Sequence, residues 1–160
     1  EEWEDNQRER KRAKKVTSAR QANYIEGRIG MVIDGTGKEY DKIRSQKADL
    51  EALGYDTHMI FVNTSIEVAL ERNAARERTV PEDVAINSWK AVQGNIGKFS
   101  SLFRGTMIIV DNNKKDDDIE KMTFKEVKRL LGKKVRNTRA KQWIEMEMKR
   151  GGITRAPKGF

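Results

Sequence analysis

The stretch His58-Met-Ile-Phe-Val-Asn63 is continuously apolar along its middle and ends in a polar residue. Two other runs share this design, Gly30-Met-Val-Ile-Asp34 and Thr106-Met-Ile-Ile-Val-Asp111. Continuous apolar runs of this length are typical of strands buried on both faces, as in parallel sheets covered by helices. The sequence therefore predicts an α/β fold, with a parallel sheet that has helices on both of its faces.

The segments between these runs are expected to be helices, because parallel strands need a crossover connection. The first helix is predicted over residues 39–53, where Gly54 suits a left-handed cap. Its inward-facing residues are expected to be Ile43, Leu50 and Leu53.

Capping boxes, in which a hydroxyl and a carboxylate satisfy the first free amides of a helix, predict two further helix starts. Thr64-Ser-Ile-Glu67 opens a helix to about Ala75, and Thr79-Val-Pro-Glu82 opens the next. A single apolar stripe at spacings of three and four then predicts one long helix. Its members are Trp89, Val92, Ile96, Phe99 and Phe103.

The flanks are predicted to be helical and strongly charged. Residues 1–26 favour one helix, residues 116–150 favour two, and the chain from Gly151 onward is expected to be an extended tail. The chain carries a net charge of +8, and residues 114–160 hold 15 Lys/Arg against 7 Asp/Glu. Such an excess favours an anionic partner such as nucleic acid, through residues 8–20 and 121–141, although it also suits solvated helix faces.

Two absences narrow the class of protein. The sequence has no cysteine, which excludes a disulfide framework and thiolate metal sites and fits a cytoplasmic setting. No apolar run reaches the roughly 18 residues that a membrane helix needs. We therefore expect no membrane partner.

Polar residues follow each apolar run, and the carboxyl ends of parallel strands are where ligands gather in such sheets. Asp34 follows an apolar run, the pattern of a Walker B strand, and a carboxylate there can hold Mg²⁺ through water beside transferring phosphates. The next turn contains Gly35, Thr36 and Lys38, whose amides and ammonium group suit an anion at a helix start. It is not a P-loop, because Gly-x4-Gly-Lys-[Ser/Thr] is absent: Val32 stands at the first position and Glu39 follows the lysine.

Three arginines straddle the end of one predicted helix and the break before the next: Arg72, Arg76 and Arg78. Arg72 and Arg76 are expected to share a helix face. Guanidinium groups on a mobile connector suit closure over phosphates, because phosphoryl transfer is mostly positioning and charge neutralisation. The alternative is a solvated basic helix end that interacts with the helix dipole.

The order of these features resembles the C-terminal part of P-loop kinase-like proteins of bacteriophages, related to the zeta toxin and polynucleotide or nucleotide kinase group. Five segments between Ala22 and Asn113 carry the resemblance. They are Met31–Ile43, Gly54–Ser65, Val68–Asn73, Arg76–Glu82 and Ile108–Asn112.

The resemblance implies ATP and Mg²⁺ as cofactors and a nucleotide or polynucleotide hydroxyl as phosphate acceptor. Asp34 matches the acidic, Mg²⁺-binding and catalytic position. Arg72, Arg76 and Arg78 match the arginine lid, in which Arg76 and Arg78 are catalytic, and Asn112 and Asn113 match the loop that lines the base. It implies a kinase-like core at 28–113 with a lid around 72–82. The composition of the flanks adds a charged helix at 1–27 and a basic helical extension and tail at 114–160.

The sequence departs from this group in lacking the Gly-x4-Gly-Lys-[Ser/Thr] loop. We therefore expect the chain to be a fragment, or to depend on a missing N-terminal segment or a partner chain, and to be inactive alone. The competing hypothesis is a non-catalytic protein whose basic helices bind nucleic acid or a phage component.

Overall fold

The computed structural model describes residues 2–114 and 117–152, and the chain forms two compact units with their boundary between Gly35 and Thr36. The first unit contains helix α1 (Glu2–Glu26), which confirms the predicted N-terminal helix. Its end is a Schellman motif, in which Arg28 adopts a φ of 51° and the Ile29 amide donates to Tyr24 O over 2.9 Å.

The predicted strand at Gly30–Asp34 is wrong, since residues 29–36 have no regular secondary structure. The side chain of Val32 is fully exposed, at 100%. A strand needs a hydrogen-bonded neighbour, and the only regular element described in the first unit is a helix. An apolar composition is therefore not sufficient to form a strand at Gly30–Asp34.

The second unit is built on a parallel pair of strands, β1 (Met59–Asn63) and β2 (Met107–Asp111). The register runs from Met59 opposite Met107 to Asn63 opposite Asp111. Both strands coincide with predicted apolar runs. The predicted α/β class with a parallel sheet is therefore confirmed.

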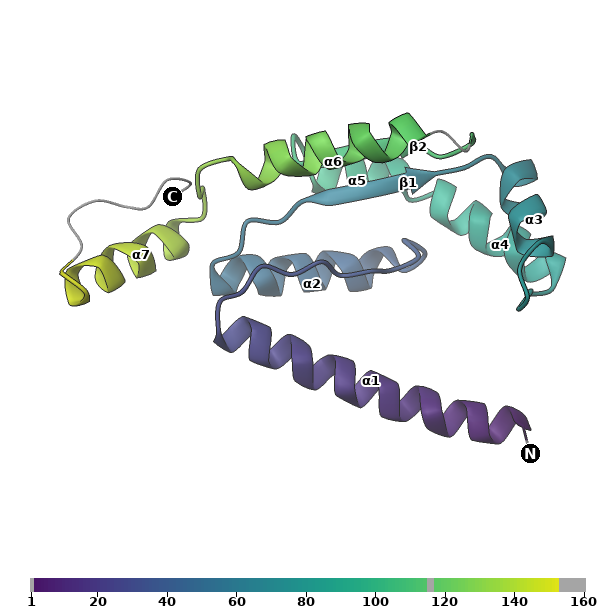
Figure 1. Cartoon of the computed structure of the whole chain (residues 1–160), viewed down its shortest axis with the longest axis horizontal. Helices are drawn as coiled ribbons and strands as arrows, with labels where there is room; N and C mark the ends of the chain where they lie inside the picture. Colours follow the sequence, from purple (N-terminus) through teal and green to yellow (C-terminus); the bar gives the residue numbers. More distant parts are fainter. Residues whose placement is uncertain (1, 115–116, 153–160) are drawn as a thin grey trace. The chain divides into compact units, whose positions relative to one another are not determined.

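Helices connect and flank these strands (Figure 1). In Figure 1 the arrow of β1 points toward α3 and α4, and α7 lies beyond the other end of that strand. The helices of this unit are α2 (Tyr40–Leu53), α3 (Ile66–Ala74), α4 (Glu82–Gln93), α5 (Ile96–Leu102), α6 (Asp117–Leu131) and α7 (Thr138–Arg150). The two helices predicted within residues 116–150 are thus α6 and α7, and the predicted tail lies, from residue 153 on, outside the described residues.

An aromatic core packs on one face of the sheet. Phe61 of β1, Phe99 of α5 and Phe103 are buried together, and Phe99 is completely inaccessible to solvent. The ring of Tyr40, at the start of α2, lies 5.5 Å from the ring of Phe99. Burial of such rings is the main stabilising term for this unit.

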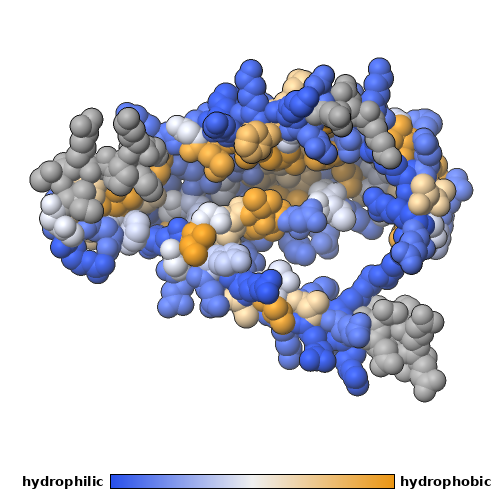
Figure 2. Space-filling view, in the orientation of Figure 1, coloured by the Kyte–Doolittle hydropathy of each residue, from blue (hydrophilic) through white to orange (hydrophobic). Residues whose placement is uncertain are grey.

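The strands were predicted to be buried on both faces, but one face is more exposed than predicted. Ile60 and Val62 point away from Phe61 and remain 42% and 56% exposed. Hydrophilic side chains cover most of the face drawn in Figure 2, with apolar patches among them. That distribution fits a chain in which 36% of the residues are charged.

The single long helix predicted through residues 89–103 is wrong, because it is divided into α4 and α5 at Gly94 and Asn95. The side chain of Asn95 is buried and donates to Gly37 O over 3.1 Å and to Lys38 O over 3.0 Å. Asn95 therefore fastens the loop before α2 to the helical layer. Gly37 has a φ of 73°, which favours glycine.

Smaller differences concern the helix ends. Gly54 ends α2 with a φ of 113°, as predicted, but Leu53 is 44% exposed rather than inward-facing. Ser65, not Thr64, caps α3 by accepting from the Val68 amide. Pro81 precedes α4 without a side-chain cap, so the second capping box does not form.

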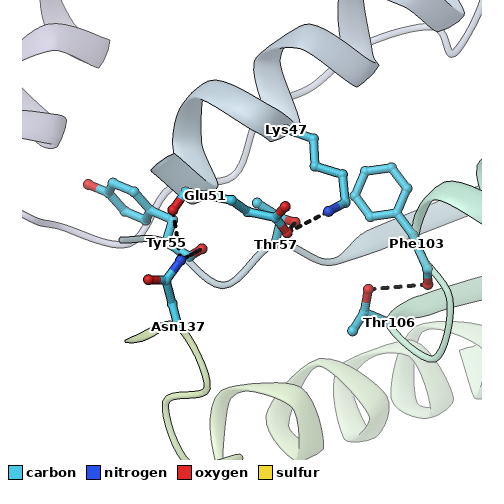
Figure 3. A network of polar contacts seen from close by, with 7 residues as sticks. All are labelled: Lys47, Glu51, Tyr55, Thr57, Phe103, Thr106 and Asn137. Atoms are coloured by element: carbon cyan, nitrogen blue, oxygen red, sulfur yellow. Dashed lines mark hydrogen bonds and ion pairs between the residues drawn. The ribbon is translucent and has the colours of Figure 1, made fainter. Parts of the chain in front are cut away.

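The start of α7 is anchored to the end of α2 by Asn137 (Figure 3). Its Oδ1 accepts from the amides of Arg139 and Ala140, and its Nδ2 donates to Glu51 O over 2.8 Å and to Tyr55 O over 3.2 Å. One side chain thus caps α7 and donates to one carbonyl within α2 and one just after it. This bond set fixes where the C-terminal basic segment emerges.

Beside this anchor, the Glu51 carboxylate accepts from the ammonium group of Lys47 and from the hydroxyl of Thr57 (Figure 3). The same ammonium group lies 5.5 Å from the centre of the Phe103 ring. Burial acts to raise the pKa of Glu51, but the two hydrogen bonds and the charge of Lys47 hold it below its ordinary value of 4.5.

Replacing Asn95 with alanine is expected to lower the free energy of unfolding by about 1–3 kcal/mol, because two loop carbonyls lose their donor. Urea denaturation followed by circular dichroism measures this loss. The matched control is Asn87→Ala on the exposed part of α4, where alanine favours the helix. Equal stabilities for the two variants would contradict the role assigned to Asn95.

Glu51→Gln is expected to destabilise the protein by about 0.5–1 kcal/mol at pH 7, a small effect because the pair is partly solvated. A carboxylate with a lowered folded-state pKa stabilises the fold above pH 4.5 and loses that contribution as the pH falls through the folded value. The difference between wild type and variant should therefore shrink toward pH 3. The exposed Glu120→Gln is the control, and a difference that grows on acidification would contradict the assignment.

Candidate functional site

The polar residues that follow β1 and β2 are hydrogen-bonded to one another. The Asn112 amide donates to Asn63 O over 2.8 Å, which extends the parallel ladder past the end of β2. Asn113 Oδ1 accepts from the Ser65 amide over 2.6 Å. The two strand ends therefore form one edge, and we call residues 63–65 and 111–113 the carboxyl edge.

Within the carboxyl edge, Asp111 shapes the turn after β2. Its Oδ1 accepts from the Asn113 amide over 3.0 Å and from Asn113 Nδ2 over 2.6 Å. Both polar atoms of the Asn113 side chain are thus engaged within the edge. The Asn113 side chain thus holds the two strand ends together. Asn112, the preceding residue, is half-buried.

Helix α4 forms one wall of this edge. Gln93 Nε2 donates to Asn63 Oδ1 over 2.7 Å, and Trp89 Nε1 donates to Thr64 O over 2.8 Å. The two side chains lie four residues apart and so share one helix face. The apolar stripe predicts Trp89 only as a core residue and does not indicate Gln93; their spacing is the signal that pairs them.

The three predicted arginines lie on the connection between α3 and α4. Arg72 is half-buried in the last turn of α3, whereas Arg76 and Arg78 are exposed in the connector 75–81. Because α3 ends at Ala74, Arg72 and Arg76 do not share a helix face, contrary to the prediction. The exposed pair is carried on a non-helical loop.

The base of this connector is closed by Asn73, a residue that the sequence patterns did not indicate. Asn73 Nδ2 donates to Val80 O over 2.8 Å, and Asn73 Oδ1 accepts from the Val80 amide over 3.1 Å. This reciprocal pair resembles a rung of a β-ladder. It fixes both ends of the loop and leaves the guanidinium groups between them in solvent, where forked contacts to phosphate oxygens are available.

The predicted residues before α2 fall on both sides of the boundary between the units. Thr36 and Lys38 belong to the second unit, are exposed, and lie on the loop that Asn95 holds. Asp34 and Gly35 belong to the first unit and are exposed in its irregular segment. Asp34 is therefore carried by a different unit from the arginines and the carboxyl edge.

The charges near the start of α3 decide where an anion is favoured. The pKa of Glu67 lies below its ordinary value because its carboxylate accepts from its own backbone amide and from the Ser65 hydroxyl. This carboxylate already offsets the positive end of the α3 dipole. An anionic ligand is thus better accommodated by the arginine connector and Lys38 than by the amides of α3.

The candidate site residues suit Mg²⁺ only when the ion is bound together with phosphate groups, which supply some of its ligands. Among the described side chains, no three Asp, Glu, His or Cys residues group together as a metal site. Mg²⁺ in phosphoryl-transfer sites commonly has one or two carboxylate ligands, with phosphates and water completing the shell. A single exposed carboxylate such as Asp34 fits that role, whereas a protein-only cage does not fit.

Comparison with known proteins relates the chain to one protein family. The zeta toxin family matches residues 6–123, a span that begins within α1 and ends within α6. It contains the carboxyl edge, the arginine connector and the loop before α2, and it extends beyond the predicted resemblance at both ends. Neither a curated protein nor a solved structure matches the chain.

None of the helices in the described part of the chain is long and apolar enough to cross a membrane.

The family match covers more than half of the chain and agrees with the observed parallel α/β architecture. The chain therefore belongs to the zeta toxin family, a family of P-loop kinase-like phosphotransferases.

Proposed function

We propose that this chain takes part in ATP-dependent phosphoryl transfer to a hydroxyl group of a nucleotide or polynucleotide. The observation that carries the proposal is the family match over residues 6–123, which includes every candidate site residue. The geometry of the second unit supports it, because the crossover that carries the arginine connector starts from the carboxyl edge at the end of β1.

In this proposal Arg76 and Arg78 contact the phosphates of ATP, and Arg72 supports them from the last turn of α3. Arg76 and Arg78 are exposed on a loop that Asn73 closes at its base, so they are able to move without disturbing the helices. Guanidinium forks neutralise the charge on the transferring group and exclude water as the loop closes.

The turn at Asn112 and Asn113 is proposed to line the base of the nucleotide. The polar atoms of the Asn113 side chain are already engaged, so its contribution is to hold the turn in place. Asn112, half-buried at the same edge, is the residue we assign to the base.

In the first unit, Asp34 is proposed to hold Mg²⁺, next to Gly35 in the sequence; in the second unit, Thr36 and Lys38 are proposed to bind an anion. When bound, Mg²⁺ neutralises charge on the transferring phosphates. Since the 160 residues contain no Gly-x4-Gly-Lys-[Ser/Thr] loop, we propose that another segment or chain provides the phosphate cradle. Transfer by these residues alone is expected to be negligible.

Titration with ATP, with and without Mg²⁺, tests this proposal by calorimetry. Wild type is expected to bind ATP with micromolar affinity. Arg76→Ala is expected to weaken binding by about 10- to 100-fold, because it removes one charge-assisted hydrogen bond to a phosphate. Arg104→Ala is the matched control, since Arg104 is exposed and lies just before the amino end of β2. It should leave the affinity unchanged.

Two results would overturn the proposal. One is equal affinity of the Arg76→Ala and Arg104→Ala variants for ATP. The other is no ATP binding together with steeply salt-dependent binding of oligonucleotides, which would favour a non-catalytic nucleic-acid-binding protein that uses residues 8–20 and 121–141.

A further inference from the structure

A groove of about 550 Å³ lies between the segment 133–136 and α7. Four cationic side chains line it, namely Lys133, Lys134, Arg136 and Lys141, against the single carboxylate of Glu145. All of these residues follow the last residue that the zeta toxin family matches. The groove is therefore a feature that the family does not assign.

The backbone that presents these cations is fixed by hydrogen bonds to other elements. The Arg136 amide donates to Asp56 Oδ2 over 2.7 Å, and Asn137 joins α7 to the end of α2. The Arg139 guanidinium group donates to Ala52 O over 2.7 Å, which holds the first turn of α7 on its other side. The backbone on both sides of the groove is thus held to α2 and to the segment before β1.

The pKa of His58, just before β1, is affected by the charges of two groove residues. Burial lowers the pKa of His58 below its ordinary value of 6.5, and the charges of Lys133 and Arg136 lower it further against the opposing charge of Asp56. The carboxylate of Asp56 therefore does not cancel the effect of Lys133 and Arg136 at His58. An anion bound in the groove would supply the missing negative charge.

We propose that this groove binds the phosphodiester backbone of a single-stranded nucleic acid. Lysine ammonium groups are flexible point charges that suit irregularly spaced phosphates, and three of the four cations are lysines. Ile144 and Met148 are apolar residues of the same lining and are available to contact sugars and bases. A concave surface admits one strand, whereas a duplex presents its own convex surface and is read by protein elements that project into its grooves.

The lining has a consequence for specificity. No aromatic side chain is among the groove residues in the described part of the chain, so bases have no stacking platform there. Binding is therefore mainly electrostatic and independent of base sequence. It stands apart from the proposed phosphoryl transfer, because the arginine connector follows the carboxyl end of β1 and His58 precedes its amino end.

Fluorescence anisotropy with a labelled single-stranded oligonucleotide tests the proposal on the full chain. Lys134→Gln combined with Lys141→Gln is expected to weaken binding about tenfold or more at low salt. It should also reduce the slope of log K against log salt by about 1.4, which is about 0.7 for each phosphate that is no longer neutralised. The control combines Lys128→Gln and Lys149→Gln, which remove the same charge from exposed positions on α6 and α7 outside the groove.

A second measurement uses His58, the only histidine of the chain, as a probe. Proton NMR titration should show that the oligonucleotide raises the pKa of His58 in wild type and in the control, and has little effect in the Lys134/Lys141 variant. Circular dichroism establishes that each variant is folded.

Three results would overturn the proposal. The first is an equal loss of affinity in the groove variant and the control, which would indicate diffuse attraction to the basic helices. The second is a pKa of His58 that the oligonucleotide does not change. The third is equal or tighter binding of a poly-glutamate peptide of the same charge, which would indicate an acidic protein partner.

Discussion

The parallel pairing of β1 with β2 is the constraint on which the second unit depends. Parallel strands end at the same edge, so Asn63 and Asp111 lie opposite each other and the residues after them meet. The bond from the Ser65 amide to Asn113 then joins two segments 48 positions apart in the sequence. The crossover from β1 must leave from this edge, which is why the arginine connector follows it. The aromatic core around Phe99 covers one face of the pair and holds that crossover in place.

Two electrostatic regions result from this arrangement. In the crossover between β1 and β2, Arg76 and Arg78 are exposed on the loop that follows α3, a position suited to recognising phosphates on a bound nucleotide. Before the amino end of β1, lysines line an open groove whose backbone is tied to α2 and to the segment before β1. The first region lies inside the family match and the second outside it. A phosphotransferase core with a separate backbone-binding surface is a consistent account of both.

Much of the second unit followed from local sequence patterns. The two apolar runs became strands, Gly54 became a left-handed cap, and the C-terminal segment formed two helices. The two largest errors have a common physical cause, because each depended on a partner distant in the chain. Gly30–Asp34 has strand composition without a neighbouring strand, and Asn95 interrupts a helical stripe to bind a loop 57 positions earlier. At the candidate site, the arginines were predicted from their charge and spacing and stay a prediction, whereas Asn73 and Gln93 act through hydrogen bonds that composition does not reveal.

Backbone amide hydrogen exchange with and without ATP and Mg²⁺ tests the central claim most directly, because it locates the nucleotide rather than only detecting it. The account predicts increased protection at three places: the loop at 36–39, the connector at 75–81 and the carboxyl edge at 63–65 and 111–113. Residues 133–148 should be unaffected. Protection confined to residues 133–148, or no change at the connector and the carboxyl edge, would contradict a nucleotide-binding role for this edge of the sheet.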